Sequence, residues 1–303
     1  MSATPNNSWR DHPRLPEAGL LLATFVWGAS YFGTKIAMGL ADPLFYVGVR
    51  FAVAAILLAL LCRDALKQVG PVEWLAAAAV GGPMAVAYVL QAAGLQQIES
   101  SKSAFITAMH VPMVPILQLI VMRLVPRRMT WVGAVLCLVG LVLLAGPETL
   151  VSSWESGEVL TVFSTVAIAV EIVMIGVFAP RVNIPAVAVL QLACVAIAAL
   201  VAMPILGEEM PATVLPLFWQ VTILMAIAVA LMQVLMNWAQ QTVSPTRAAL
   251  IYSSEPVWAG IIGWFVGERL GVVALVGCGM ILLGVLVSEW RPGDRSRTSA
   301  SEC

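Results

Sequence analysis

The feature that most limits how this chain can fold is a series of apolar runs that recur from residue 18 to residue 290. Each run is about 20 residues long, which lets an α-helix cross the ~30 Å hydrocarbon core of a bilayer. Only 11% of the 303 residues are charged, whereas about 25% is usual for a soluble domain. The sequence therefore predicts an all-α integral membrane protein.

Ten membrane-spanning helices fit these runs. We expect them at residues 18–38, 43–62, 73–94, 103–123, 129–146, 158–180, 185–206, 217–240, 247–266 and 271–290. Residues 1–16 and 291–303 are polar and are expected to form short cytoplasmic tails.

The distribution of positive charge predicts the orientation of these helices. If the N-terminus is cytoplasmic, the segments on that side hold 12 of the 16 Lys and Arg residues, whereas the opposite segments hold only Lys102 and Arg269. Lys35 and Arg50 fall inside spans. Because cytoplasmic loops carry an excess of Lys and Arg, we expect an N-in/C-in topology.

The two halves of the chain resemble each other at a constant offset of 144 residues. At this offset the first-half residues Gln96, Pro112, Gly133 and Gly140 match Gln240, Pro256, Gly277 and Gly284. We therefore expect two five-helix repeats, at residues 17–147 and 157–290. Because five is odd, the second repeat enters the membrane from the opposite side, and such inverted repeats are typical of carriers that work by alternating access.

Polar side chains inside the apolar runs mark the candidate substrate site. They gather in the first, third, fourth, sixth, eighth and ninth spans, so these six helices are expected to wall a water-accessible cavity. The candidate substrate-binding residues are Trp27, Tyr31, Tyr88, Gln91, His110, Asn237 and Tyr252. The alternative for any single hydroxyl or amide is a packing bond within or between helices.

Three of the ionisable residues inside spans need separate explanations, because a charge in the membrane is costly. Glu171 and Glu255 lie at similar depth, some 12–13 Å from the cytoplasmic side by helix rise. Together they could exchange protons or pair with a cationic group of the substrate; each could instead be protonated and hydrogen-bonded between helices. For Arg50 we expect a structural partner, such as carbonyl groups freed near a broken helix.

A proline stands at the same place in both halves, one residue after Glu255 and two residues after His110. Pro256 cannot donate to the carbonyl of Tyr252, and Pro112 stands in the same relation to Ala108. We therefore expect each half to carry a kink beside a polar residue near mid-membrane, where it could act as a gating point.

Two segments resemble the EamA branch of the drug/metabolite transporter superfamily. They are WGASYFGTKIAMGLADPLFYVGVRFAVAAILLAL at 27–60 and SPTRAALIYSSEPVWAGIIGWFVGERLGVVALVGCGMILLGVLV at 244–287. The resemblance implies a ten-helix inverted-repeat carrier with a central cavity. It carries the Glu-Pro element of the family onto Glu255 and Pro256, and its basic opening onto Lys35 and Arg50. Glu171 matches no motif of the family.

We therefore expect a secondary carrier that exports a small metabolite, an amino acid or related amine, across the bacterial inner membrane. Substrate and membrane lipid are its expected partners. Protons are a possible coupling ion, and the protein is expected to be either a monomer or a homodimer. The alternatives are a proton-coupled exporter of cationic drugs and a lipid flippase. No HExxH, GxSxG or P-loop motif predicts an enzyme. No cofactor or metal is expected, and a net charge of −1 favours no nucleic-acid partner.

Overall fold

The computed structural model describes residues 14–95, 97–98, 103, 106–145, 156–211, 213–265 and 271–289, and every regular element among them is helical. The elements are α1 (Leu15–Met38), α2 (Pro43–Leu61), α3 (Arg63–Leu66), α4 (Pro71–Leu95), α6 (His110–Met122), α7 (Arg128–Ala145), α8 (Ser156–Phe178), η3 (Ala179–Arg181), α9 (Ile184–Ile205), α10 (Pro216–Ala239), α11 (Pro245–Tyr252), α12 (Glu255–Phe265) and α13 (Val272–Glu289). The expected all-helical class is confirmed.

Six of these helices are long and apolar enough to cross a membrane. They are α1, α2, α4, α8, α9 and α10. A proline lies in the first turn of the helices α2, α9, α10 and α11. A proline at that position loses no helical hydrogen bond, because its N–H would have no partner within the helix.

The other four expected spans are shorter or interrupted helices. The helix expected over 247–266 is divided into α11 and α12 by a turn at Ser253 and Ser254. In the span expected over 103–123, a turn at Met109 precedes α6, which starts at His110. Both interruptions lie just before a proline, Pro256 or Pro112, which removes a helical hydrogen bond at that place.

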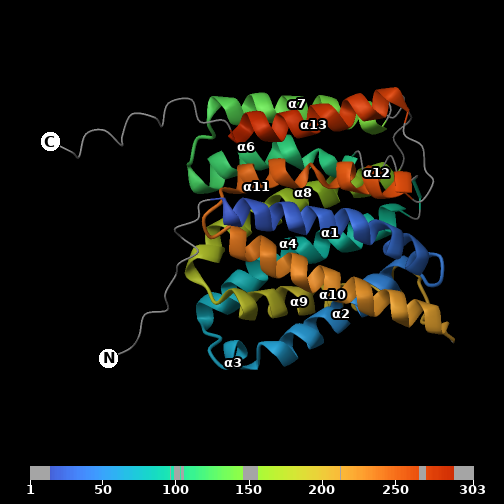
Figure 1. The fold of residues 1–303 in the computed structure, drawn as a ribbon. Helices are drawn as coiled ribbons and strands as arrows, with labels where there is room; N and C mark the ends of the chain where they lie inside the picture. Colours follow the sequence, from blue (N-terminus) through green and yellow to red (C-terminus); the bar gives the residue numbers. More distant parts are fainter. Residues whose placement is uncertain are drawn as a thin grey trace, which may run out of the picture.

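Helices from the two halves pack against each other in exchanged pairs. Helix α1 packs on α10 and α4 on α8, while α2 lies against α9 and α7 against α13. Figure 1 shows α7 and α13 side by side at one edge of the bundle, and α2 near α9 and α10 at the other. In the expected repeat, α1 corresponds to α8 and α4 corresponds to α10. The α1–α10 pair and the α8–α4 pair are therefore equivalent.

The α7–α13 crossing brings two backbones into direct contact at four glycines. A Cβ added to Gly133 would lie 2.5 Å from the carbonyl oxygen of Gly284, and one added to Gly277 would lie 2.5 Å from that of Gly140. At the 144-residue offset Gly133 corresponds to Gly277 and Gly140 to Gly284, so the two contacts are equivalent in the expected repeat. Small residues at such a crossing are what lets membrane helices approach closely.

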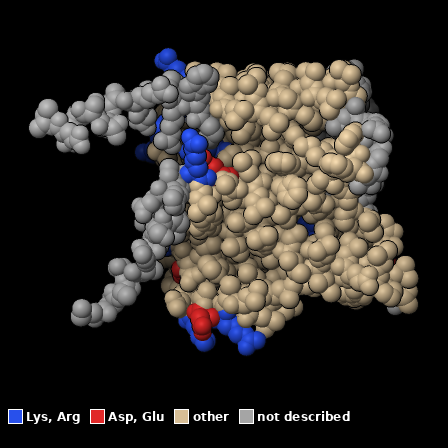
Figure 2. All heavy atoms as spheres, in the orientation of Figure 1, with Lys and Arg blue, Asp and Glu red and all other residues tan. Residues whose placement is uncertain are grey.

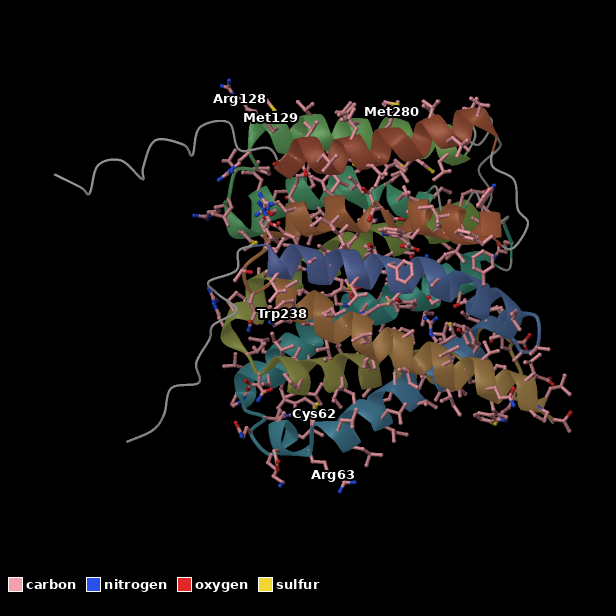
Figure 3. The ribbon with its side chains drawn as sticks, viewed as in Figure 1. Cys62, Arg63, Arg128, Met129, Trp238 and Met280 are labelled. Carbon is pink, nitrogen blue, oxygen red and sulfur yellow. The ribbon has the colours of Figure 1, made fainter. Side chains whose placement is uncertain are left out.

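The surface of the bundle separates charged from apolar groups. Lys, Arg, Asp and Glu gather at the end where α1 begins and α13 ends, and most of the visible side wall is uncharged (Figure 2). Arg128 projects from this charged end in Figure 3, and Arg63 projects from the lower edge of the bundle. Large apolar side chains such as Ile56, Phe163 and Leu286 are exposed on the wall, which suits contact with lipid.

Candidate functional site

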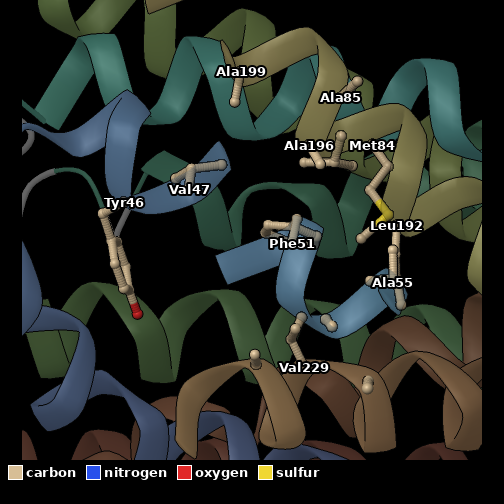
Figure 4. Close-up of a cluster of buried hydrophobic side chains, with 14 of the residues drawn as sticks. Tyr46, Val47, Phe51, Ala55, Met84, Ala85, Leu192, Ala196, Ala199 and Val229 are labelled. Atoms are coloured by element: carbon tan, nitrogen blue, oxygen red, sulfur yellow. The ribbon is translucent and has the colours of Figure 1, made fainter. Parts of the chain in front are cut away.

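The first polar cluster lies where α1, α2 and α4 meet. Arg50 on α2 is only 8% exposed, and its Nη1 donates to Thr34 Oγ1 and to the Tyr46 hydroxyl, both at 3.3 Å. Figure 4 shows Tyr46 and Phe51 among the buried side chains of α2, α4, α9 and α10. Arg50 thus has partners within the protein, but those that the described residues provide are hydroxyl groups rather than the freed carbonyls given as the example; the fold brings them from α1 and from one turn earlier on α2.

The second cluster joins α8, α9 and α10 around a buried carboxyl group. Glu171 on α8 lies within hydrogen-bonding reach of the Gln233 side chain on α10. Gln191 on α9 donates to Gln233 Oε1 at 2.8 Å, and Gln233 Nε2 contacts the sulfur of Met84 at 3.6 Å. Gln191 and Gln233 are visible in the sequence as amides inside apolar runs, but neither is among the candidate substrate-binding residues.

Tyr252 and Asn237 are both buried, with different partners. Gln240 Nε2 donates to the Tyr252 hydroxyl at 3.1 Å, which links α11 to the end of α10. Tyr252 also lies within electrostatic range of Glu171. Asn237 donates its amide to the backbone carbonyl of Gln233 in its own helix at 2.8 Å, so the packing role is the one its contacts display.

The interruption between α11 and α12 is held by serine hydroxyls and lies against α1. Ser253 and Ser254 each donate to a backbone carbonyl three residues earlier, at 2.6 Å, and Ser254 also contacts Thr24 of α1 at 3.2 Å. A Cβ on Gly28 of α1 would lie 3.0 Å from the carbonyl oxygen of Glu255. Glu255 is the first residue of α12, where the helix dipole favours a negative charge.

The corresponding place in the first half carries an imidazole. His110 opens α6, and its Nδ1 lies 2.9 Å from the carbonyl oxygen of Thr107. The other ring nitrogen is buried and has no hydrogen-bond partner among the described residues. Gln91 of α4 donates to the Thr107 hydroxyl at 3.3 Å. Gln91, Thr107 and His110 therefore form one small polar group between α4 and the start of α6.

Tyr88 on α4 connects these clusters. Its hydroxyl lies within electrostatic range of Arg50, Glu171 and Glu255, which come from α2, α8 and α12. Trp27 is half-buried and packs on the apolar cluster around α1 and α11. The side chain of Tyr31 lies outside the described residues. The structure thus brings Arg50 close to the ring of Tyr88, with its Cζ 5.8 Å from the ring centre, while two carboxyl groups lie within electrostatic range of the same tyrosine.

A depression of about 370 Å³ opens at the end of the bundle remote from the charged end, and it is distinct from these clusters. Its lining is residues 38–43 with Pro211. None of the candidate residues contributes to it, and the only ionisable group in its wall is Asp42. We therefore locate the candidate site at the buried clusters around Tyr88.

Another buried amide was missed by the sequence reasoning because its partner is distant in the chain. Gln118 of α6 accepts hydrogen bonds from the backbone N–H and the hydroxyl of Thr246, at 3.0 and 2.9 Å. These bonds tie α6 to the first turn of α11, so Gln118 holds the two interrupted segments together.

Known proteins with similar sequences extend over almost the whole chain. The model of the EamA-like transporter family matches twice, over residues 15–146 and 155–290. An uncharacterized transporter of Archaeoglobus fulgidus is 28% identical over 278 residues, covering 91% of this chain and 86% of the relative. The uncharacterized inner membrane transporter YedA of Escherichia coli strain K12 is 28% identical over 290 residues, covering 90% of each.

The fold has also been seen in a solved structure, titled only as the crystal structure of a protein. It superposes with a TM-score of 0.73 at 19% identity, over 90% of this chain and 96% of the other, a likeness that concerns the fold alone. With family matches covering both halves, and with the helical bundle and apolar wall described above, the chain belongs to the EamA-like transporter family.

Proposed function

We propose that this transporter is a secondary carrier that exports small metabolites, with amino acids and related amines as the substrate class, by alternating access. It lies in the inner membrane, as YedA does. The charged end of the bundle is assigned to the cytoplasm by the positive-inside rule, which gives the N-in/C-in topology with ten spans.

One observation carries the substrate class. Arg50, Glu171 and Glu255 come from both halves of the chain and all lie within electrostatic range of Tyr88. Ionisable groups inside a membrane bundle mark substrate or ion pathways by default. A site with both signs of charge and an aromatic wall suits a zwitterion with an apolar side chain. The positive charge of Arg50 disfavours the alternative substrate, a lipophilic cation.

Alternating access is supported by the exchanged packing of the two halves and by the polar contacts at both ends of the bundle. At the charged end, Glu17 pairs with Arg247, and Glu73 accepts from the Asn183 N–H at 3.3 Å. At the other end, Glu208 accepts from the N–H groups that open α2. Each contact joins the two expected repeats, so opening either end requires breaking the contacts there.

The interruptions beside Pro112 and Pro256 supply the flexible points in this proposal. In α11–α12 the turn at Ser253 and Ser254 separates two helical segments, and α12 starts with Glu255. Rotation at such a turn moves one segment without unfolding the other. Helix breaks of this kind are tolerated where the backbone faces protein or a cavity.

Counterflow in proteoliposomes tests the carrier function directly. Vesicles loaded with unlabelled L-amino acids should accumulate the labelled compound transiently, whereas protein-free vesicles should not. Lack of exchange for all twenty amino acids and for their decarboxylated amines would refute the proposed substrate class.

Proton coupling through Glu171 or Glu255 is tested in the same vesicles. We expect the double change Glu171→Gln and Glu255→Gln to remove the dependence of exchange on an imposed pH gradient. Unchanged rates and an unchanged pH response in that variant would contradict coupling through these acids.

A further inference from the structure

The surroundings of Arg50 are arranged around its guanidinium group. The Cζ atom lies 5.2 Å from the ring centre of Tyr46, 4.9 Å from that of Phe51 and 5.8 Å from that of Tyr88. The Phe51 and Tyr88 rings also meet edge to face at 4.7 Å. Three aromatic rings therefore enclose the cation and keep it away from lipid.

The charge of Arg50 is not compensated by any carboxylate that the structure describes. No Asp or Glu in the described ranges lies within 4 Å of the guanidinium, although two such ion pairs occur elsewhere, at Lys67 and Arg247. Its Nε atom is buried and has no acceptor among the described residues. A buried cation that has neutral hydroxyls and aromatic rings around it but no counter-charge is unfavourable, so a role in binding explains it better than a role in folding.

The available donors match a carboxylate. A guanidinium presents five N–H donors in a planar fork that can bind both oxygens of a carboxylate. Thr34 and Tyr46 both accept from Nη1, and their hydroxyl groups contact each other at 3.2 Å. They hold one side of the fork, and Nε has no partner among the described residues. A single cation suits a monoanion rather than a phosphate group, which carries about −1.5 to −2 charges at neutral pH.

The depth of Arg50 is compatible with a substrate that also reaches the acids. Arg50 lies seven residues into α2, and Tyr88 lies seven residues from the end of α4, which corresponds to about 10 Å from the non-cytoplasmic ends of these helices. Glu171 and Glu255 lie deeper toward the cytoplasmic end. Tyr88 is within electrostatic range of all three, so a substrate beside this ring is within reach of both signs of charge.

We propose that Arg50 is the residue that binds the carboxylate group of the substrate, positioned by Thr34 and Tyr46, while the amino group of the same molecule faces the acids beyond Tyr88. The substrate is then an amino acid rather than the corresponding amine. This inference rests on the proposed carrier function and narrows it.

Matched pairs of compounds test the inference in the wild-type protein without any mutation. In the counterflow assay, each L-amino acid that exchanges is compared with the amine that lacks only its carboxylate: leucine with isoamylamine, phenylalanine with phenethylamine, and lysine with cadaverine. We expect the amine to compete about 10-fold to 100-fold more weakly, the range set by a lost charge-assisted hydrogen bond. Equal competition by the amine overturns the carboxylate site and leaves the carrier function intact.

Variants of Arg50 provide the second arm. Arg50→Gln should weaken amino-acid exchange by a similar factor and leave any residual amine exchange unchanged, and Arg50→Lys should be intermediate because it keeps the charge but loses the fork. Arg63→Gln, at an exposed arginine of α3, is the matched control and should behave as wild type. If Arg50→Gln does not fold, Thr34→Val removes one positioning hydroxyl and should raise the half-saturating amino-acid concentration.

The outcomes separate the two proposals. Amino-acid exchange that survives Arg50→Gln at wild-type affinity overturns the assignment of Arg50. Exchange of amines without exchange of amino acids also overturns the assignment of Arg50, but it supports the carrier function. Exchange of neither class overturns both proposals together.

Discussion

The contact between Glu208 and the start of α2 allows one prediction to be worked through quantitatively. The Glu208 carboxylate accepts from the Leu44 N–H at 2.9 Å and from the Phe45 N–H at 3.3 Å. These N–H groups belong to the first turn of α2, which has no hydrogen-bonding side chain at its N-cap, Asp42. The carboxylate therefore takes the place of a capping residue, although it comes from the other half of the chain.

Replacing Glu208 by Gln keeps the length of the side chain but removes its charge. A hydrogen bond to a charged group contributes about 1.5–3 kcal/mol and a neutral one about 0.5–1.5 kcal/mol. The helix dipole adds roughly 0.3–1 kcal/mol for the negative charge. The 3.3 Å bond to Phe45 is long for a charge-assisted contact, so we count one strong bond. The expected loss is about 2 kcal/mol, or roughly 4 °C in Tm for a large domain.

The assay is thermal unfolding of the purified protein in detergent, followed by tryptophan fluorescence. Glu209→Gln is the matched control, because Glu209 is the next residue in the chain and is exposed. We expect the control to unfold within a degree or so of the wild type. If Glu208→Gln unfolds at the same temperature as Glu209→Gln, the carboxylate does not cap α2 and the reasoning is refuted.

Three further changes test other parts of the fold. Gly277→Val should destabilise the protein by at least 1–3 kcal/mol through overpacking against a backbone oxygen, whereas Gly279→Val should have little effect because a Cβ there meets nothing within 4 Å; urea or thermal unfolding compares the two. Glu73 accepts hydrogen bonds from the backbone N–H groups of Gly70 at 2.9 Å and Asn183 at 3.3 Å; Glu73→Gln removes the charge of this acceptor and should lower the unfolding temperature at neutral pH, and an unchanged value would show that the charge of the acceptor does not stabilise the fold. Gln118→Leu leaves the buried Thr246 N–H without an acceptor and should cost about 1–3 kcal/mol, measured in the same way; an unchanged unfolding temperature would show that water replaces the amide.

The positions of the helices followed closely from the chain. The expected spans 18–38, 43–62 and 217–240 compare with Leu15–Met38, Pro43–Leu61 and Pro216–Ala239 in the structure. The reason is local: an apolar run of this length satisfies its backbone only as a helix in lipid, and prolines and polar loops mark where each run ends. The family resemblance was readable for the same reason, since its motifs are contiguous segments.

The interruption in the ninth span was predictable in kind but not in position. Pro256 indicated a break, yet the turn lies at Ser253 and Ser254, so Glu255 becomes the first residue of a new helix. The serine hydroxyls and the close approach of Gly28 select this geometry. Contacts from α1, more than 200 residues earlier, cannot be read from the local sequence.

The sequence by itself determined the class of protein, the placement of its apolar helices and the places where prolines interrupt them, because each depends on residues adjacent in the chain. Only the tertiary structure decided the partners of the buried polar groups. Arg50 meets the hydroxyl of Thr34 rather than freed carbonyls, and Glu171 meets Gln233. A helix presents its polar residues in several directions, and the packing of the two halves selects which of them meet.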